Sequence, residues 1–206
     1  MSAFLGIDTS NYTTSAALFD SEANTIIQSK KLLPVKAGEL GLRQSDAVFA
    51  HVKQLGDMVQ NVFAEYGGKI TAIGVSTRPR DIDGSYMPCF LVGEMAANCL
   101  GAALNVPVLP FAHQQGHVAA ALYSAGRLDL FRERFIAFHL SGGTTEALLA
   151  EPRAERIIRC TKIGGSMDLK AGQAVDRIGV MLGLSFPAGK YLEELALKSD
   201  RKFKIK

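Results

Sequence analysis

The sequence predicts an α/β protein with parallel strands in its sheet and with two lobes. Three observations lead to this fold class: a run of short strands over residues 4–33, strand–helix alternation over residues 45–125, and a second run of strands from about residue 135. Alternating strands and helices form sheets with parallel members against which the helices pack. The restart of the strand pattern divides the chain into a first lobe at residues 1–128 and a second at 129–206.

The first part of the chain reads as three strands followed by a helix. The strands are expected at residues 4–8, 15–19 and 26–33, with a turn at 11–14. Between Val48 and Tyr66 the apolar residues recur every three or four positions, which predicts an amphipathic helix. Ser45 is its expected N-cap, and Gly67-Gly68 its expected stop.

The middle of the chain alternates between strands and helices. We expect strands at residues 70–77 and 106–109, and a helix that carries two histidines and ends near residue 125. The loop at residues 78–88 leads into a helix at 89–104 that is apolar on nearly every side. Such a helix is expected to be fully buried.

The second lobe opens with strands at residues 135–140, 145–150 and 156–161. Helices are expected at 174–182 and 190–197, and a strand at 202–206. About 75 residues are too few, by roughly half, for a lobe that matches the first. We therefore expect a complete first lobe, a partial second lobe and a truncated chain.

The composition fits a folded protein of the cytoplasm. Of the 206 residues, 48% are hydrophobic, which is enough for a substantial core. No apolar run reaches the roughly 18 to 20 residues that span a bilayer, and the first residues lack the pattern of a secretory signal. Cys89, Cys99 and Cys160 form no CxxC pair and are expected to be reduced core residues.

The net charge of +3 is concentrated at the end of the chain, so the sequence predicts no broad basic face for nucleic acid. Residues 198–206 hold five Lys or Arg against one Asp, a net of +4, so the remainder of the chain is near −1. The short cationic end is interpreted as a solvated segment, with a phosphate contact as the alternative.

His113 and His117 form the most informative pair of the sequence. Residues four apart on a helix project from the same face, so the two imidazoles can share one metal ion, Fe or Zn. The alternative is a pair on a helix surface without a metal. Residue 114 is Gln, so the general base of an HExxH zinc peptidase is missing.

Two turns and one acidic residue complete the chemical signals. Asp8 and Ser10 lie in a turn whose carboxylate, hydroxyls and N–H groups suit a phosphate or a metal, and they are the catalytic candidates; an ordinary Asx turn is the alternative. The glycine-bearing turn at 141–145 lets the backbone approach an anion, or simply closes a hairpin. Asp176 and the loop at 186–190 suit a nucleoside, or are a surface acid and a helix cap.

The order of these motifs resembles the TsaD family, the tRNA N6-adenosine threonylcarbamoyltransferases formerly classed as O-sialoglycoprotein endopeptidases. Residues 5–10 (LGIDTS) resemble the family's LGIETS, His113–His117 its HxEGH helix, and residues 141–145 (SGGTT) its SGGHT loop. Residues 171–177 (AGQAVDR), followed by LGL at 182–184 and PAG at 187–189, resemble its GEAFDK, LLGL and PGG series. Four motifs in the right order are specific, and they cover most of the chain.

This resemblance implies the two-lobed actin, sugar-kinase and heat-shock-ATPase fold, with metal and nucleotide in the cleft between lobes. His113 and His117 would be the metal ligands. The residues that would contact ATP or threonylcarbamoyl-adenylate are His139, Leu140, Ser141, Gly142, Gly143, Asp176 and Gly189. The implied reaction passes threonylcarbamoyl from an adenylate to N6 of an adenosine in tRNA. The implied partners are tRNA and a TsaB-like paralogue or a second copy of the chain.

Several positions depart from the family. Residues 11–14 (NYTT) replace its Cys-Asp-Glu-Thr, so acidic groups associated with transfer are missing. The charged segment 78–84 replaces its Gly-Pro-Gly loop, Thr144 replaces a His, and its third metal ligand would lie beyond Lys206. These departures favour an alternative function, a non-catalytic paralogue that acts as a partner or regulatory module. A metallopeptidase is the third, least supported function.

Overall fold

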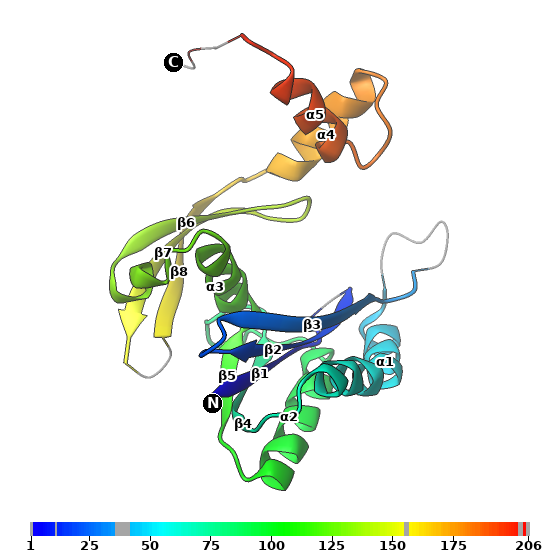
Figure 1. Cartoon of the computed structure of the whole chain (residues 1–206). Coiled ribbons are helices and arrows are strands. Elements are labelled where there is room, and N and C mark those ends of the chain that lie inside the picture. The colour runs from blue at the N-terminus through cyan, green and yellow to red at the C-terminus, as the bar shows by residue number, and fades with distance from the viewer. Residues whose placement is uncertain (1, 11, 36–41, 155–156, 202–203, 205–206) are drawn as a thin grey trace. The chain divides into compact units, whose positions relative to one another are not determined.

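The computed structural model describes residues 2–10, 12–35, 42–154, 157–201 and 204. The chain forms two compact units (Figure 1). Unit 1 comprises Met1–Asp129 and Arg153–Ile158, and unit 2 comprises Leu130–Pro152 and Arg159–Lys206. A short 3-10 helix, η1 (Leu128–Arg132), lies where the chain passes from the first to the second.

Unit 1 is built on a five-stranded sheet with the order β3-β2-β1-β4-β5. The strands are β1 (Ala3–Asp8), β2 (Thr13–Asp20), β3 (Thr25–Leu32), β4 (Ile70–Arg78) and β5 (Val108–Ala112). β2 pairs antiparallel with β1 and β3, whereas β1, β4 and β5 are mutually parallel. The carboxyl ends of these three parallel strands therefore meet at one edge of the sheet.

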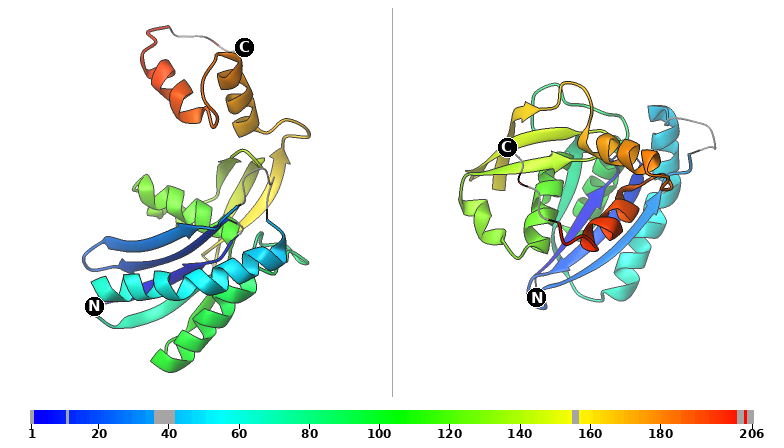
Figure 2. Two further views of the ribbon diagram at one scale, coloured as in Figure 1. Left: turned by 90° about the vertical axis from the view of Figure 1, so that its right-hand side faces the viewer. Right: turned by 90° about the horizontal axis from the view of Figure 1, so that it is seen from above.

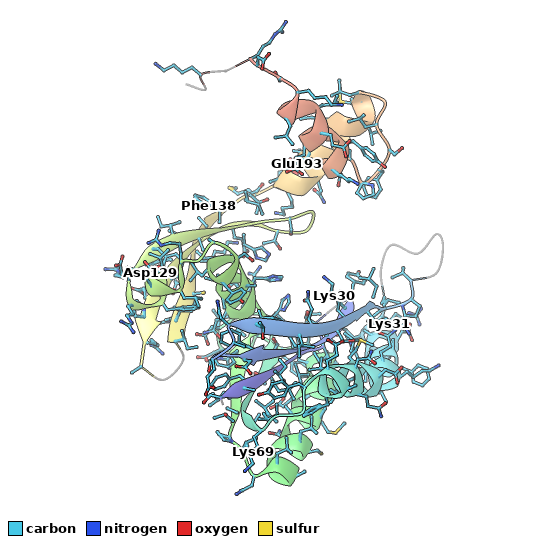
Figure 3. The ribbon with its side chains drawn as sticks, in the orientation of Figure 1. Lys30, Lys31, Lys69, Asp129, Phe138 and Glu193 are labelled. Carbon is cyan, nitrogen blue, oxygen red and sulfur yellow. The ribbon has the colours of Figure 1, made fainter. Side chains whose placement is uncertain are left out.

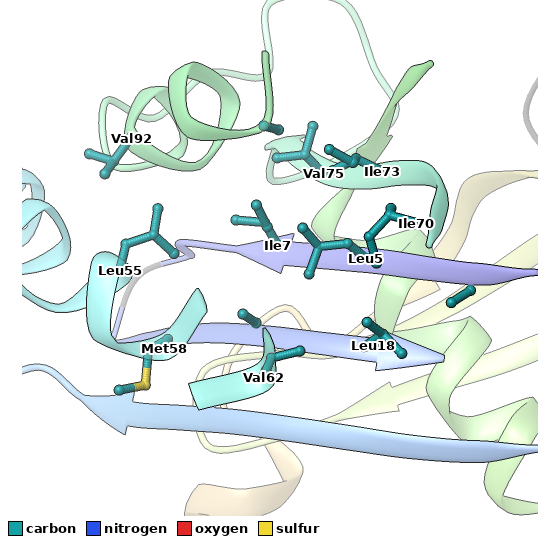
Figure 4. Close-up of a cluster of buried hydrophobic side chains, with 13 residues drawn as sticks. Leu5, Ile7, Leu18, Leu55, Met58, Val62, Ile70, Ile73, Val75 and Val92 are labelled. Carbon is teal, nitrogen blue, oxygen red and sulfur yellow. The ribbon is translucent and has the colours of Figure 1, made fainter. Parts of the chain in front are cut away.

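Helices cover both faces of this sheet (Figure 2). α1 (Gln44–Glu65) and α2 (Phe90–Leu104) lie on one face, and α3 (His113–Ser124) lies on the other. The main core fills the space between the sheet and the first two helices, where Leu55, Met58 and Val62 of α1 point toward the strands (Figure 4). This burial of apolar surface is the main force that holds unit 1 together.

The period of two along the strands separates the core from a polar face. Leu5 and Ile7 of β1 are buried in the core, and Asp8 belongs to the opposite face, the one that carries α3. On the neighbouring strand, Val75 is buried in the same core, and Ser76 reaches the Asp8 carboxylate. The two strands thus present polar groups at their carboxyl ends, beside the first residues of α3.

Unit 2 contains a three-stranded sheet and two helices. β6 (Phe135–Leu140), β7 (Thr145–Arg153) and β8 (Ile157–Gly165) follow in that order, and β6 pairs antiparallel with β7. α4 (Ala171–Met181) and α5 (Gly189–Leu197) pack against each other. One face of β6 is apolar and exposed, since Ile136, Phe138 and Leu140 are all more than half accessible. Figure 3 labels Phe138 on this strand.

Most predicted elements are present, but α2 and its surroundings differ from expectation. Leu91 and Met95 are 49% and 56% exposed, so α2 is not fully buried, because only one side of it packs on the sheet. The strand expected at 106–109 lies at 108–112. Val106 instead donates its N–H to the Gly101 carbonyl and closes the end of α2.

Three further expectations are corrected. α1 begins at Gln44 with Arg43 as N-cap and no side-chain cap, so Ser45 is not the capping residue. Cys99 is exposed, whereas Cys89 and Cys160 are buried as expected, and none of the three forms a disulfide bond. α4 begins at Ala171 rather than near 174, because its first N–H groups are bound by the preceding hairpin.

Two remaining expectations concern the chain end and the membrane. Most of the strand expected at 202–206 falls outside the described residues. Within the described part of the chain, none of the helices combines the length and apolar character that crossing a bilayer requires.

A buried polar network ties α1 to β2 and β3. The Thr14 hydroxyl donates to Gln54 Oε1 at 3.0 Å and lies 2.8 Å from His51 Nδ1. Because the single hydroxyl proton goes to Gln54, the His51 ring donates from Nδ1 to Thr14. Gln54 in turn donates to the Leu32 carbonyl at 3.3 Å. Burial lowers the pKa of His51, although the Asp8 charge raises it in part, so folding favours the neutral ring.

We expect acid to destabilise unit 1 through His51. Below its usual pKa of 6.5 the unfolded chain takes up a proton that the folded ring does not. The free energy of unfolding should therefore be highest above pH 6.5 and fall below it, by up to about 1.4 kcal/mol per pH unit from this one group. Urea unfolding at several pH values should show a weaker pH dependence for His51→Gln than for the unchanged chain. If the free energy of unfolding depended on pH equally in both chains, His51 would not be the group responsible.

In unit 2 the first turn of α4 lies against the hairpin at 141–145. Gly172 donates its N–H to the Ser141 carbonyl at 3.1 Å, and Ala171 donates to Thr145 Oγ1 at 2.7 Å. A Cβ at Gly172 would lie 2.6 Å from the Gly142 nitrogen and 2.7 Å from the Ser141 carbonyl carbon. Both are backbone atoms, so glycine is required by this close approach.

Gly172→Ala should push the hairpin and α4 apart. We expect a loss of about 1 to 3 kcal/mol in the stability of unit 2, as for other overpacked sites. Gly143→Ala is the matched control, because open space surrounds Gly143. Thermal unfolding of the two variants should separate them. A Gly172→Ala chain as stable as the control would show that the contact is looser than described.

Candidate functional site

The Asp8 carboxylate is the centre of a polar cluster in unit 1. Its Oδ1 accepts the Ser10 N–H at 2.8 Å, which forms an Asx turn. Its Oδ2 accepts the Ser76 hydroxyl at 2.6 Å and lies 2.7 Å from His113 Nδ1. The catalytic candidates Asp8 and Ser10 therefore lie in one turn, where Ser10 contributes its backbone and Asp8 reaches His113.

These contacts determine the charge of Asp8. Burial would raise the pKa of this carboxyl, but the hydrogen bond and positive charge of His113, with hydrogen bonds from Ser10 and Ser76, outweigh burial. The pKa of Asp8 is held well below its usual range. The group is thus a carboxylate throughout the neutral range of pH.

His113 and His117 lie together on the first turns of α3. Their ring centroids are 4.2 Å apart, and the rings meet edge to face. Gln115 fixes the start of this helix, since its Oε1 accepts the Ala112 N–H at 2.7 Å and its Nε2 donates to the Ile158 carbonyl at 2.6 Å. The helix thus presents both imidazoles beside the carboxyl ends of β1 and β4.

Thr9 joins the turn that carries Asp8 to the start of α2. The buried Thr9 hydroxyl donates to the Cys89 carbonyl at 2.9 Å and accepts the Gly93 N–H at 3.1 Å. A Cβ at Gly93 would approach Thr9 Oγ1 to 2.9 Å, so α2 approaches the turn closely only because residue 93 is glycine. This contact holds the polar cluster against the start of α2.

The donors of unit 1 fit part of a metal site. Among the residues that the structure describes, no three His, Cys, Asp or Glu side chains converge as a ligand set. Two adjacent imidazoles can nevertheless occupy two positions of a Zn or Fe ion. His113 also has the carboxylate partner that metal-binding histidines use to orient the ring. The pair therefore suits a metal whose other ligands come from water or a bound substrate.

The remaining predicted residues lie in unit 2. The Ser141 hydroxyl accepts the N–H groups of Gly143 and Thr144, at 3.3 and 2.9 Å, which closes the hairpin turn. His139 and Leu140 end β6 just before this turn, and Glu146 of β7 pairs with His139 across the sheet. The turn is therefore well ordered by its own hydrogen bonds, in addition to its contact with α4.

Asp176 has a defined structural contact. It lies in the middle of α4, and its Oδ1 accepts the Ala188 N–H at 2.8 Å. Ala188 immediately precedes Gly189, the first residue of α5. One carboxylate oxygen thus holds the 187–189 loop in place.

Sequence reasoning missed two residues that shape the unit 1 site. Ser76 donates to the Asp8 carboxylate and belongs to no motif, whereas Gln115 fixes the start of α3 and lies within the His113–His117 motif but was given no role. Ser76 had a weak signal: it is polar, and it lies near the end of an apolar strand that was expected to pair in parallel. Gln115 stands between two histidines, a position that gives no sign that its side chain bonds to the Ala112 N–H and to the Ile158 carbonyl.

The charged loop at 78–84 is folded onto itself and onto α3. Arg78 pairs with Asp81, and the Arg80 N–H donates to the Ser85 hydroxyl at 3.0 Å. The Pro79 carbonyl accepts the Gln114 N–H at 3.1 Å, which caps one of the first amides of α3. The loop therefore supports the histidine helix by a backbone contact.

Comparison with known proteins gives consistent results. The family model for TsaD, tRNA N6-adenosine threonylcarbamoyltransferase, matches residues 23–206. The chain is 29% identical over 198 residues to the tRNA N6-adenosine threonylcarbamoyltransferase of Neisseria meningitidis serogroup A, covering 93% of this chain and 52% of that protein. The chain thus spans about half the length of the curated relatives it matches.

A solved structure shares the fold. YeaZ from Pseudomonas aeruginosa superposes with a TM-score of 0.50 at 19% identity, over 84% of this chain and 68% of that one. The fold is that of actin, the sugar kinases and the heat-shock ATPases, as expected. On the match over residues 23–206, the chain belongs to the TsaD family of tRNA N6-adenosine threonylcarbamoyltransferases.

Proposed function

We propose that this chain binds a divalent metal and an adenine nucleotide and takes part in threonylcarbamoyl transfer to adenosine in tRNA. The polar cluster of Asp8, Ser76, His113 and His117 is the observation that carries the proposal. The family match supports the reaction class. The cytoplasm is the expected compartment, and a TsaB-like paralogue or a second copy of the chain is the expected partner.

In unit 1, His113 and His117 would hold the metal, Fe or Zn. When bound, such an ion supplies a Lewis acid that stabilises charge on a carbonyl oxygen. Asp8 orients His113 through their hydrogen bond, and the Ser10 N–H holds the Asp8 carboxylate in its Asx turn. A metal held by the two imidazoles would supply the positive charge that favours an anionic ligand such as a phosphate or a carbamate.

In unit 2, His139–Gly143, Asp176 and Gly189 would contact ATP or threonylcarbamoyl-adenylate. The turn at 141–145 and the 187–189 loop both lie beside α4. A hydrogen bond from the first turn of α4 holds the 141–145 turn, and a hydrogen bond to Asp176 holds the loop. A rigid support of this kind lowers the cost of ordering the loops around a ligand.

A second candidate function is that of a non-catalytic partner of a full-length relative. Two observations favour it: residues 11–14 lack the acidic pair of the family, and β6 exposes an apolar face. Such faces often mark surfaces that another polypeptide covers. The metal and nucleotide measurements below discriminate between the two functions.

His113→Ala should remove the metal from the purified chain. We expect one Fe or Zn per chain in the unchanged protein and little in the variant, as measured by elemental mass spectrometry. His139→Ala is the control, because it removes a histidine of unit 2 and leaves the pair intact. Equal metal content in all three chains would refute the ligand assignment, and no metal in any would favour the partner function.

Asp176→Ala should weaken ATP binding by at least about tenfold, since it frees the 187–189 loop and removes one charge-assisted hydrogen bond. Isothermal titration calorimetry would measure the change. Asp168→Ala is the matched control, because Asp168 is exposed and lies outside α4. An Asp176→Ala chain that binds ATP like the control would remove Asp176 from the site.

A further inference from the structure

We infer that Ser76 and Asp8 act together as positioning residues that fix which ring nitrogen of His113 carries the proton. Ser76 belongs to none of the family motifs found in the sequence. The inference deepens the proposed metal function and rests on it for its purpose, but its physical content is a property of the chain without metal.

The argument starts from the hydrogen-bonding capacity of the carboxylate. An ionised carboxylate only accepts hydrogen bonds, so the 2.7 Å contact between Asp8 Oδ2 and His113 Nδ1 requires the proton on Nδ1. The neutral ring then has its lone pair on Nε2. Nε2 is therefore the nitrogen of His113 that can bind a metal.

Ser76 matters because it fixes the orientation of the carboxylate. Ser10 holds Oδ1 through its N–H, and Ser76 holds Oδ2 through its hydroxyl at 2.6 Å. With both oxygens held, the carboxylate cannot turn its plane away from the imidazole. Ser76 is only 8% exposed and lies on β4, directly beside β1 in the sheet, so the hold comes from a rigid element.

An amide at residue 8 would reverse this arrangement. In an Asp8→Asn chain, the amide oxygen satisfies the Ser10 N–H, and the NH₂ group then faces Ser76 and His113. Since the NH₂ group donates, His113 Nδ1 must accept, and the ring proton moves to Nε2. An Asp-to-Asn change produces the wrong tautomer in the same way in other Asp–His pairs.

The first test measures the tautomer directly in the metal-free chain. The sequence holds four histidines, so long-range ¹H–¹⁵N correlation spectra are simple, and His113→Ala identifies the ring. At a pH where the rings are neutral, we expect the Nδ1–H form in the unchanged chain and the Nε2–H form in Asp8→Asn. Ser76→Ala should give a mixture of the two forms, and Ser76→Thr, which keeps the hydroxyl, should restore the first.

Ser15→Ala is the matched control. The Ser15 hydroxyl also bonds to Asp8, but to its main-chain carbonyl, at 3.4 Å, so the tautomer should not change. A structural effect of losing any hydroxyl near Asp8 would appear in both serine variants. Ser76→Ala and Ser76→Thr test how the Asp8 carboxylate is oriented without changing Asp8 itself. The conclusion therefore stands even if the Asp8→Asn chain does not fold.

The second test is the affinity for Zn²⁺ alone, measured by calorimetry. We expect Asp8→Asn to weaken binding about 10- to 100-fold, as for other partners of metal-binding histidines, and Ser76→Ala to act in the same direction. An Nε2–H form in the unchanged chain, or identical spectra for Ser76→Ala and the unchanged chain, would overturn the inference. The expected tautomers without Zn²⁺ binding would support it and would refute the proposed metal site instead.

Discussion

The contact between Asp8 and His113 joins residues that stand 105 positions apart in the sequence, and the arrangement of unit 1 makes it possible. β1, β4 and β5 run parallel, so the end of β1 and the residue after β5 arrive at the same edge of the sheet. β4 lies between them and supplies Ser76. The site is therefore a direct product of strand order.

Local periodicity was enough to locate most elements. Spacing of three and four residues predicted α1, and the four-residue interval between His113 and His117 placed their rings together. The exposure of Leu91 and Met95 could not be derived from α2 itself, because it depends on how much of the helix the sheet covers. The position of β5 likewise depended on a tertiary contact, the closing of α2 by Val106.

Partners across the sheet were the hardest part of the site to predict. Asp8 was recognisable as a turn residue. Its second carboxylate oxygen accepts a hydrogen bond from Ser76, and this contact could not be predicted because neither strand's sequence identifies its partner in the sheet. The same holds for Gln115, which bonds to the carbonyl of Ile158. In unit 2, by contrast, the Ser141 hydroxyl accepts hydrogen bonds within its own turn, so the local sequence was sufficient to predict the turn.

The alternation along β1 limits how this protein could have changed during evolution. Ile7 lies in the core and Asp8 in the polar cluster, one residue apart. An insertion or deletion of a single residue within β1 would exchange the two faces, and place a carboxylate among apolar side chains. Length variation is tolerable only where it leaves this register intact, as in the residues between β4 and α2, which lie outside β1.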